Sequence, residues 1–210
     1  DGSPWMLVTE KNINKPQDLI GKTLAVSGIR TSPYYFLMAA LKKWEIPEKN
    51  ISIITTGGTS DSFLALSTHR VAGTVLTPPF DDKAVSLGFK KFQFLGDLAP
   101  IPYVGLVTSK AKMKAERDIV QRTIAALFDS VAWLRANRDE SVKMIVEKFK
   151  VKEGEGKNTY ATLIKLLNQD GRLDPKVARD YIDLLRQERP IPADFDPQKL
   201  LDFSLLPAGR

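Results

Sequence analysis

Cysteine is absent from the 210-residue sequence. This absence excludes disulfide frameworks, thiolate nucleophiles and zinc or iron–sulfur sites held by cysteine. Histidine occurs once, as His69, where a helix is expected to end, and the partial negative charge of a helix C-terminus suits an ordinary surface histidine. A catalytic triad or metal site needs partners that the sequence does not show. We therefore expect no catalytic residue, no metal and no cofactor.

Long apolar runs are also missing. No stretch approaches the roughly 20 apolar residues that a helix needs to cross a bilayer. The opening residues, DGSPWMLVTE, lack the basic start and the apolar core of a signal peptide. Any export signal is therefore expected to have been removed before residue 1.

The charge of the chain is positive but dispersed. A net charge of +6 suits an anionic partner, yet the lysines and arginines are scattered, and the run KAKMKAER (110–117) is interrupted by Glu116. No recognition motif or interleaved aromatic residues accompany the charge, so we expect no binding to nucleic acid. The hydrophobic content of 43% is ordinary for a globular protein with a real core.

Strand-like and helical patterns alternate between residues 21 and 109. Each unit has a short apolar, β-branched run, a turn of small polar residues and then apolar residues at helical spacing. This alternation predicts an α/β lobe, with a parallel sheet covered by helices. The units are KTLAVS with PYYFLMAALKKW, ISIITT with DSFLALSTHR, and VAGTVLT with DDKAVSLGF, followed by the strands KFQFLGD and VGLVTS.

Helical patterns dominate the rest of the chain. A long amphipathic helix is expected over 116–137, and further helices through ESVKMIVEKF, near 158–168 and over 175–188, whereas the glycine-rich KEGEGKN is expected to be a loop. The apolar stripe of the long helix comprises Ile119, Ile124, Leu127, Phe128, Val131 and Leu134. If WMLVTE and VGLVTS belong to a second sheet, that sheet has few strands, and these helices have little to pack on.

In open α/β sheets, ligands sit beyond the carboxyl ends of the strands, where turns lead into helix N-termini. In the first such turn, SGIRTS (27–32), Gly28 permits a tight bend, Ser32 is a natural N-cap and Pro33 a natural first helical residue. Free amides and hydroxyls there attract an anion, and Arg30 offers a bidentate pair. A helix cap without any ligand is the alternative.

Two further turns complete the expected rim. In TTGGTS (55–60), Asp61 already complements the helix dipole and repels anions, so contact is expected only through Gly58 or Thr59. In LTPPFDD (76–82) a double proline ends the strand, and its aspartates are expected as dipole partners rather than catalytic residues. Tyr103 follows PIP, and its ring either lines a cleft or packs in the core.

The ordered set DLIGKTLAVS, AALKKWEI, GGTSDSFLAL, VAGTVLTPPFD and PYVGLVTSK resembles the periplasmic solute-binding proteins of the nitrate, sulfonate and taurine uptake type, a family that also includes thiamine-precursor binders. The resemblance covers residues 16–137. It implies two α/β lobes that close by a hinge on a small polar or anionic molecule. It also implies a periplasmic or otherwise extracytoplasmic location and delivery to an ABC permease with its own ATPase.

By this resemblance residues 21–103 form the complete second lobe, and residues 1–20 and 104–210 form a remnant of the first lobe. WMLVTE and VGLVTS are then the crossing strands. The ligand-binding candidates that the resemblance places near the cleft are Ser27, Arg30, Thr31, Ser32, Gly58, Thr59, Thr77, Pro78 and Tyr103.

The sequence departs from this family in length. Members normally begin with a further βαβαβ segment of about ninety to a hundred residues, which builds most of the first lobe and half of the ligand site. Without it we expect an uncovered apolar face on the C-terminal helices, hidden in a homo-oligomer or by a complementing chain.

Two other functions are alternatives. The pyrimidine synthase of eukaryotic thiamine biosynthesis shares the fold, but its cysteine-rich motif has no counterpart here and His69 is badly placed for its chemistry. The effector-sensing domain of a bacterial transcription regulator has a similar two-lobed plan and length. It predicts dimerisation and a co-inducer response without a transporter, and it fits the long helical C-terminus poorly.

Overall fold

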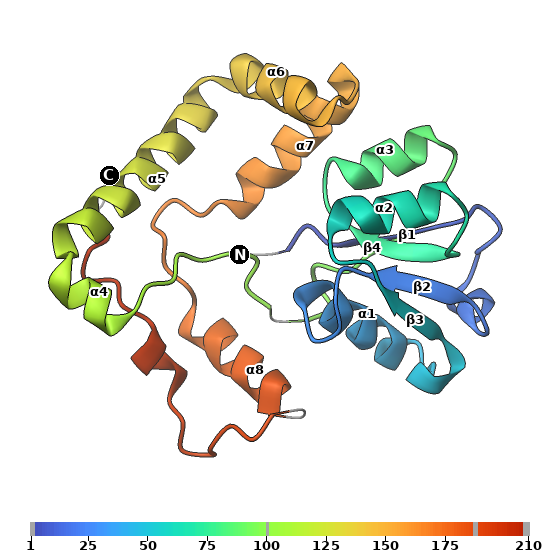
Figure 1. Ribbon diagram of the computed structural model, residues 1–210, viewed down its shortest axis with the longest axis horizontal. Coiled ribbons are helices and arrows are strands. Elements are labelled where there is room, and N and C mark those ends of the chain that lie inside the picture. Colours follow the sequence, from blue (N-terminus) through green and yellow to red (C-terminus); the bar gives the residue numbers. More distant parts are fainter. Residues whose placement is uncertain (1–2, 100, 187–188, 208–210) are drawn as a thin grey trace.

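The structure is a computed structural model that describes residues 3–99, 101–186 and 189–207. An α/β lobe lies on one side of the molecule and a chain of helices on the other (Figure 1). None of the helices in these ranges has the length and apolar character needed to span a bilayer.

Five strands form one open sheet in the order β3-β2-β4-β1-β5. The strands are β1 (Met6–Thr9), β2 (Thr23–Val26), β3 (Ser52–Thr55), β4 (Gly73–Leu76) and β5 (Lys90–Phe94). β2 runs parallel to β3 and β4, whereas β1 runs antiparallel to β4 and β5. The predicted α/β lobe is confirmed, with one strand reversed.

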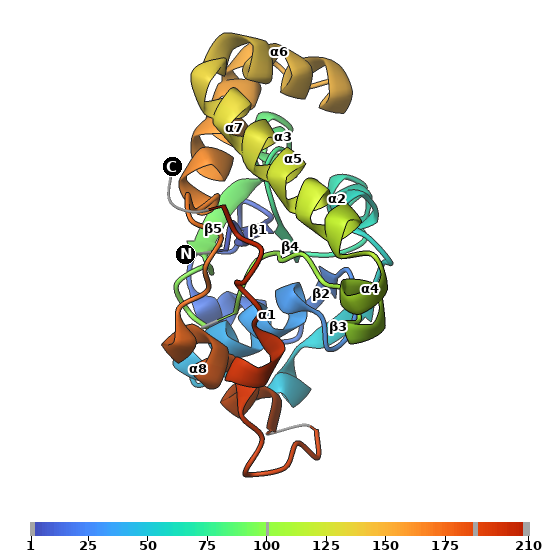
Figure 2. The same cartoon turned by 90° about the vertical axis from the view of Figure 1, so that its left-hand side faces the viewer.

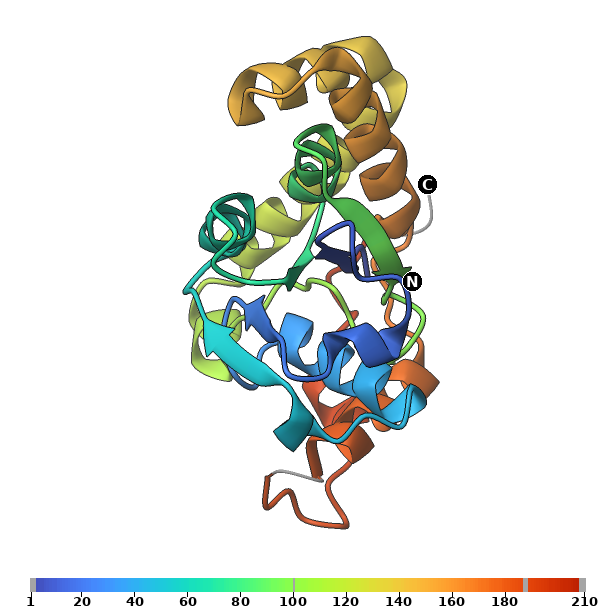
Figure 3. The same ribbon diagram turned by 90° about the vertical axis from the view of Figure 1, so that its right-hand side faces the viewer.

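Helices cover both faces of the sheet, which Figure 3 shows from its edge. The lobe contains α1 (Ser32–Lys43), α2 (Thr59–Ser67) and α3 (Phe80–Ser86), with short 3-10 turns at Pro16–Leu19 and Glu48–Asn50. Successive strand residues point to opposite faces. In β2, accordingly, Leu24 and Val26 pack in the core that contains α1, and Ala25 packs in the core that contains α2 and α3.

The C-terminal helices form an arm beside the lobe (Figure 2). They are α4 (Lys110–Ala115), α5 (Arg117–Ala136), α6 (Arg138–Phe149), α7 (Glu153–Leu166) and α8 (Pro175–Arg186), followed by a 3-10 turn at Pro197–Leu200. The arm meets the lobe through α6, α7 and α8. Phe149 of α6 contacts Phe80 of α3 edge to face, and α8 packs Tyr181, Leu184 and Leu185 against the α1 core.

The apolar stripe of α5 is only partly covered, with Ile119 and Leu127 as its exposed members. Val120 is the one buried residue of this 20-residue helix, whereas Ile119, Leu127 and Trp133 are exposed. The neighbouring segment 104–107 adds three more exposed apolar side chains, those of Val104, Leu106 and Val107. The expected uncovered apolar face is therefore present only in part, because Phe128 lies against Gly171 and the stripe residues Ile124, Val131 and Leu134 are half-buried.

Two sequence-based expectations, a strand at 104–109 and a loop at KEGEGKN, were wrong, and the conditional placement of residues 6–9 in a second sheet does not hold. Residues 6–9 form β1 within the sheet of the lobe rather than in a second sheet, because Leu7 and Val8 bury one side chain in each of its two cores. The segment 104–109 forms no strand. KEGEGKN begins helix α7 instead of forming a loop, since the Glu155 carboxylate accepts a hydrogen bond from the Lys152 amide at 2.8 Å and caps the helix.

Candidate functional site

The carboxyl ends of β2, β3 and β4 lie at one edge of the sheet because the three strands are parallel. The turns 27–31, 56–58 and 77–79 follow these ends and lead into α1, α2 and α3. All three turns that the sequence singled out therefore share one edge. We call this edge the strand-end rim.

The first turn is organised by Thr31. Its hydroxyl donates a hydrogen bond to the Gly28 carbonyl at 2.6 Å, and its own carbonyl accepts the first helical bond of α1 from the Tyr35 amide at 3.1 Å. The expectation that Ser32 caps the helix was wrong. Thr31 holds the N-cap position, so Ser32 and Pro33 are the first two helical residues. The Thr31 side chain does not cap the helix, and the first amides of a helix have no acceptor within it.

Arg30 occupies the tip of this turn. Its φ of +61° lies in the left-handed region, which is uncommon for a residue with a side chain, and its side chain is exposed at the rim. The backbone therefore turns sharply here and places Arg30 two residues before Ser32, the first residue of α1. A cation and a helix N-terminus at the same place both favour a negatively charged ligand.

The second turn is tied to the first by backbone hydrogen bonds. The Thr56 amide donates to the Val26 carbonyl at 3.1 Å, and the Gly57 amide donates to the Ser27 carbonyl at 3.0 Å. Gly57 has a φ of +90°, a conformation that side chains rarely adopt. These bonds bring Ser27 beside the turn that contains Gly58 and Thr59.

An acidic side chain shields the second turn. Gly58 is the N-cap of α2 and Thr59 its first residue. A side chain at Gly58 would meet the Asp61 carboxylate at 3.2 Å, so that carboxylate lies against the glycine backbone. This placement agrees with the expectation that Asp61 complements the dipole of α2 and disfavours anions there.

The third turn brings Thr77 and Tyr103 together. Thr77 is buried at the end of β4, and its side chain is hydrogen-bonded to the phenol of Tyr103. Burial raises the pKa of the Tyr103 phenol above its ordinary value, and the bond from Thr77 offsets part of that rise. Pro78 follows Thr77 and precedes Pro79, the N-cap of α3, with a cis peptide bond between the two prolines. Tyr103 thus lies at the rim, although 26 residues separate it from Thr77 in sequence.

Trp5 is a rim residue that sequence reasoning missed. Met6 of β1 pairs with Leu76 of β4, so Trp5 comes level with Thr77 at the same edge of the sheet. Its indole is buried and meets the Tyr103 ring edge to face, with 6.3 Å between ring centroids. The indole N–H has no hydrogen-bond partner among the described residues. The residue that precedes a strand lies beside the C-terminal ends of the neighbouring strands only when that strand runs antiparallel to them. The sequence contains no signal that β1 runs antiparallel.

The remaining titratable candidates lie elsewhere. His69 is exposed at the end of α2 and pairs with Glu10 at 3.1 Å, on the edge of the sheet opposite the rim. Asp81 and Asp82 stand in the first turn of α3, as expected, and both carboxylates bind the Lys91 ammonium, at 2.7 and 2.8 Å. The described ranges contain no cluster of acidic and histidine side chains suited to a metal ion.

A family model described as NMT1/THI5 like matches residues 3–141, more than half of the chain. The chain belongs to the NMT1/THI5-like family. The match includes the whole α/β lobe, the strand-end rim and all of α5, so the matched family region contains the candidate site.

Three known proteins similar to this NMT1/THI5-like chain carry names of binding proteins. A taurine-binding periplasmic protein of Escherichia coli (strain K12) is 47% identical over 53 residues, which are 25% of this chain and 16% of that relative. The alkanesulfonate-binding protein SsuA of Xanthomonas axonopodis pv. citri, solved with MOPS, superposes with a TM-score of 0.76 at 16% identity and covers 95% of this chain. SsuA of Escherichia coli superposes with a TM-score of 0.68 at 15% identity over 94% of this chain.

These superpositions establish the fold as that of the periplasmic binding proteins. At such low identity they say nothing about which ligand this chain holds. The superposed part is 71% of the Xanthomonas protein and 68% of the Escherichia coli SsuA, so both proteins contain further structure without a counterpart in this chain. This difference agrees with the interpretation of one complete lobe and one incomplete lobe.

Proposed function

We propose that this NMT1/THI5-like chain is the solute-binding component of an ABC-type importer in an extracytoplasmic compartment. It captures a small polar or anionic organic molecule, of the sulfonate, taurine, nitrate-like or pyrimidine-precursor kind, between two lobes and delivers it to a membrane permease. The observation that carries this proposal is the convergence of three strand-end turns and Tyr103 on one edge of the sheet.

The rim suits a ligand with an acidic group and a polar or planar remainder. Arg30 and the N-terminus of α1 supply positive charge and amide donors for the acidic group. Ser27, Thr31 and Ser32 add hydroxyls beside them, and Gly58 and Thr59 follow from the next turn. Thr77, Pro78 and Tyr103 bound the other side of the site, where an aromatic ring and a hydroxyl favour contact with the body of the ligand.

Catalysis is the weaker interpretation. The relatives named above are binding proteins, and the chain has no cysteine from which to build a pyrimidine-synthase motif. Its single histidine pairs with Glu10 on the edge opposite the rim. No feature of the structure favours an effector-sensing domain of a regulator over a transport protein.

Isothermal titration of the purified protein with taurine, ethanesulfonate, nitrate and a hydroxymethylpyrimidine tests the ligand class. We expect at least one acidic ligand to bind. Arg30→Ala should weaken that ligand by about 1.5–3 kcal/mol, roughly ten- to a hundredfold in Kd, because a charged hydrogen-bond donor is lost. Arg70→Ala, an exposed arginine at the far end of α2, is the matched control and should leave the Kd unchanged.

Two results would contradict the proposal. Binding of the neutral pyrimidine without binding of any acidic ligand would refute the preference for anions. Equal affinities of the Arg30→Ala protein and the unaltered protein would show that Arg30 does not bind the ligand. Covering of the exposed α5 face by a second copy or another chain stays a prediction. Light scattering of the purified protein measures that oligomeric state directly.

A further inference from the structure

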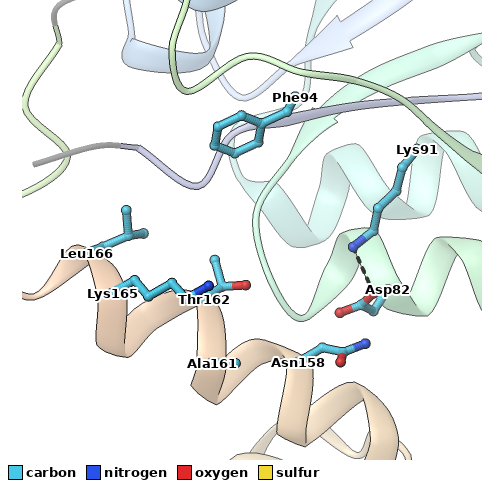
Figure 4. Close-up of a pocket in the computed structure, with 8 residues that line it drawn as sticks. All are labelled: Asp82, Lys91, Phe94, Asn158, Ala161, Thr162, Lys165 and Leu166. Carbon is cyan, nitrogen blue, oxygen red and sulfur yellow. Dashed lines mark hydrogen bonds and ion pairs between the residues drawn. The ribbon is translucent and has the colours of Figure 1, made fainter.

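A pocket with a volume of about 380 Å³ lies between α7 and the β5–α3 part of the lobe (Figure 4). β5 is an edge strand, paired only with β1 in the described sheet, so one of its sides is left for the arm of helices. The residues that line the pocket are Asp82, Lys91, Phe94, Asn158, Ala161, Thr162, Lys165 and Leu166. None of the rim candidates is among them.

One wall of the pocket is a stripe along α7. Asn158, Thr162 and Lys165 follow one another at intervals of four and three residues and therefore share a face of the helix. Figure 4 shows their side chains directed from α7 toward the same space. None of the three makes a side-chain hydrogen bond or ion pair within the described ranges, so this wall offers a cation, a hydroxyl and an amide.

The opposite wall carries an excess of negative charge. The Lys91 ammonium lies 2.7 Å from an Asp81 carboxylate oxygen and 2.8 Å from an Asp82 oxygen. Two carboxylates share one ammonium, so the group has a formal charge of −1 when all three are ionised. Asp82 is the member that lines the pocket beside Lys91, and Figure 4 shows it on the side of Asn158.

The pocket also has an apolar end. The Phe94 ring, which is exposed at the end of β5, and the Leu166 side chain lie away from Asp82 and Asn158 (Figure 4). Ala161 adds a small apolar surface on α7. The lining therefore combines one unpaired positive charge, one net negative charge and an apolar region within a single cavity.

We propose that this pocket is a second ligand site that takes a small zwitterion with an apolar substituent, such as an α-amino acid. The ammonium of the ligand faces Asp82 and Asn158, its acid group accepts hydrogen bonds from Lys165 and Thr162, and its apolar substituent packs on Phe94. A ligand with only one charge leaves the charge of one wall uncompensated, which weakens binding. The proposal is independent of the function proposed for the rim.

Isothermal titration of the purified protein with L-leucine as the probe tests the proposal. L-Leucine should bind, whereas 4-methylpentanoate, which lacks the amine, and 3-methylbutylamine, which lacks the acid, should bind at least tenfold more weakly. Lys165→Met should weaken L-leucine by roughly tenfold or more, because a charged donor is lost. Lys157→Met is the matched control, since Lys157 is on the same helix, pairs with Glu153 outside the pocket and should leave the affinity unchanged.

The Arg30→Ala protein separates the two sites. It should bind L-leucine as the unaltered protein does, because Arg30 does not line the pocket. Absence of L-leucine binding, equal affinity for the two singly charged analogues, or an unchanged affinity in Lys165→Met would overturn the pocket proposal and leave the rim untouched. Loss of L-leucine binding in Arg30→Ala would place the amino acid at the rim and would overturn it too.

Discussion

Replacement of Lys91 by methionine should destabilise the lobe strongly. The Asp81 carboxylate is only 4% exposed, and Lys91, which is 33% exposed, is the cation that compensates it. One oxygen of Asp81 already has no hydrogen-bond partner among the described residues. Breaking a fully buried ion pair from one side costs about 3–5 kcal/mol, because a charge is left without compensation. The partial exposure of Lys91 favours the low end, so we expect a loss of about 3 kcal/mol at neutral pH.

Urea unfolding followed by circular dichroism measures this loss. With a slope of about 2 kcal/mol/M, 3 kcal/mol lowers the unfolding midpoint by about 1.5 M. The double variant Lys91→Met with Asp81→Asn removes the more deeply buried of the two stranded carboxylates, Asp82 being the other, and should recover part of the stability. A loss below about 1 kcal/mol in Lys91→Met, or no recovery in the double variant, would refute the argument that Asp81 depends on Lys91.

The pH dependence provides an independent check on the same pair. Burial raises the pKa of Asp81 above its ordinary value, and Lys91 lowers it only in part. The folded state therefore binds the Asp81 proton more tightly than the unfolded state does. The contribution of Asp81 to stability is fully present below its unfolded pKa and is lost as the pH rises through its folded pKa. In Lys91→Met the folded pKa rises further, so the loss should extend to higher pH.

Two other substitutions test the packing around the rim and the arm. Thr77→Val removes a hydrogen-bond donor to the Tyr103 phenol, so it should lower the free energy of unfolding by about 1 kcal/mol and raise the pKa of Tyr103 further. Urea unfolding measures the first effect, and ¹³C NMR of the tyrosine rings measures the second. Gly156→Ala should lower the free energy of unfolding by about 1–3 kcal/mol, because the new methyl group would lie 2.6 Å from the Val146 side chain. Gly154→Ala is the control: it has open space around it and should stabilise α7 slightly. Equal effects of the two substitutions would contradict this packing argument.

The lobe was predictable because its pattern is local. Short apolar runs such as TLAV and GTVL are flanked by turn residues and followed by helical spacing, and each became the expected strand or helix within a few residues. The parallel pairing of β2, β3 and β4 follows from the helices between them, and it places the three turns at one edge. The position of these three turns could therefore be predicted from the alternating order of strands and helices.

Other features depended on contacts that the sequence does not encode locally. The reversal of β1 and the arrival of Trp5 at the rim require pairing with β4 and β5, which are more than sixty residues away. Helix α7 tolerates two glycines because Gly156 lets it approach α6 closely, a reason that is invisible without the partner helix. The pocket between α7 and β5 likewise joins residues that no motif connects.

The two proposed sites would select ligands by local geometry rather than by the net charge of the chain. The chain has six more cations than carboxylates, yet the Lys91 ammonium is compensated by both Asp81 and Asp82, so its charge adds little attraction for an anion. At the rim, Arg30 would attract an anionic ligand more strongly than its single charge suggests. The left-handed turn places it beside the N-terminus of α1, where the helix dipole also favours negative charge. In the pocket, by contrast, Lys165 and the acidic group around Lys91 line the same surface hollow. A uniform positive field would attract any anion, whereas the two proposed sites would discriminate among ligands by the position of each charge.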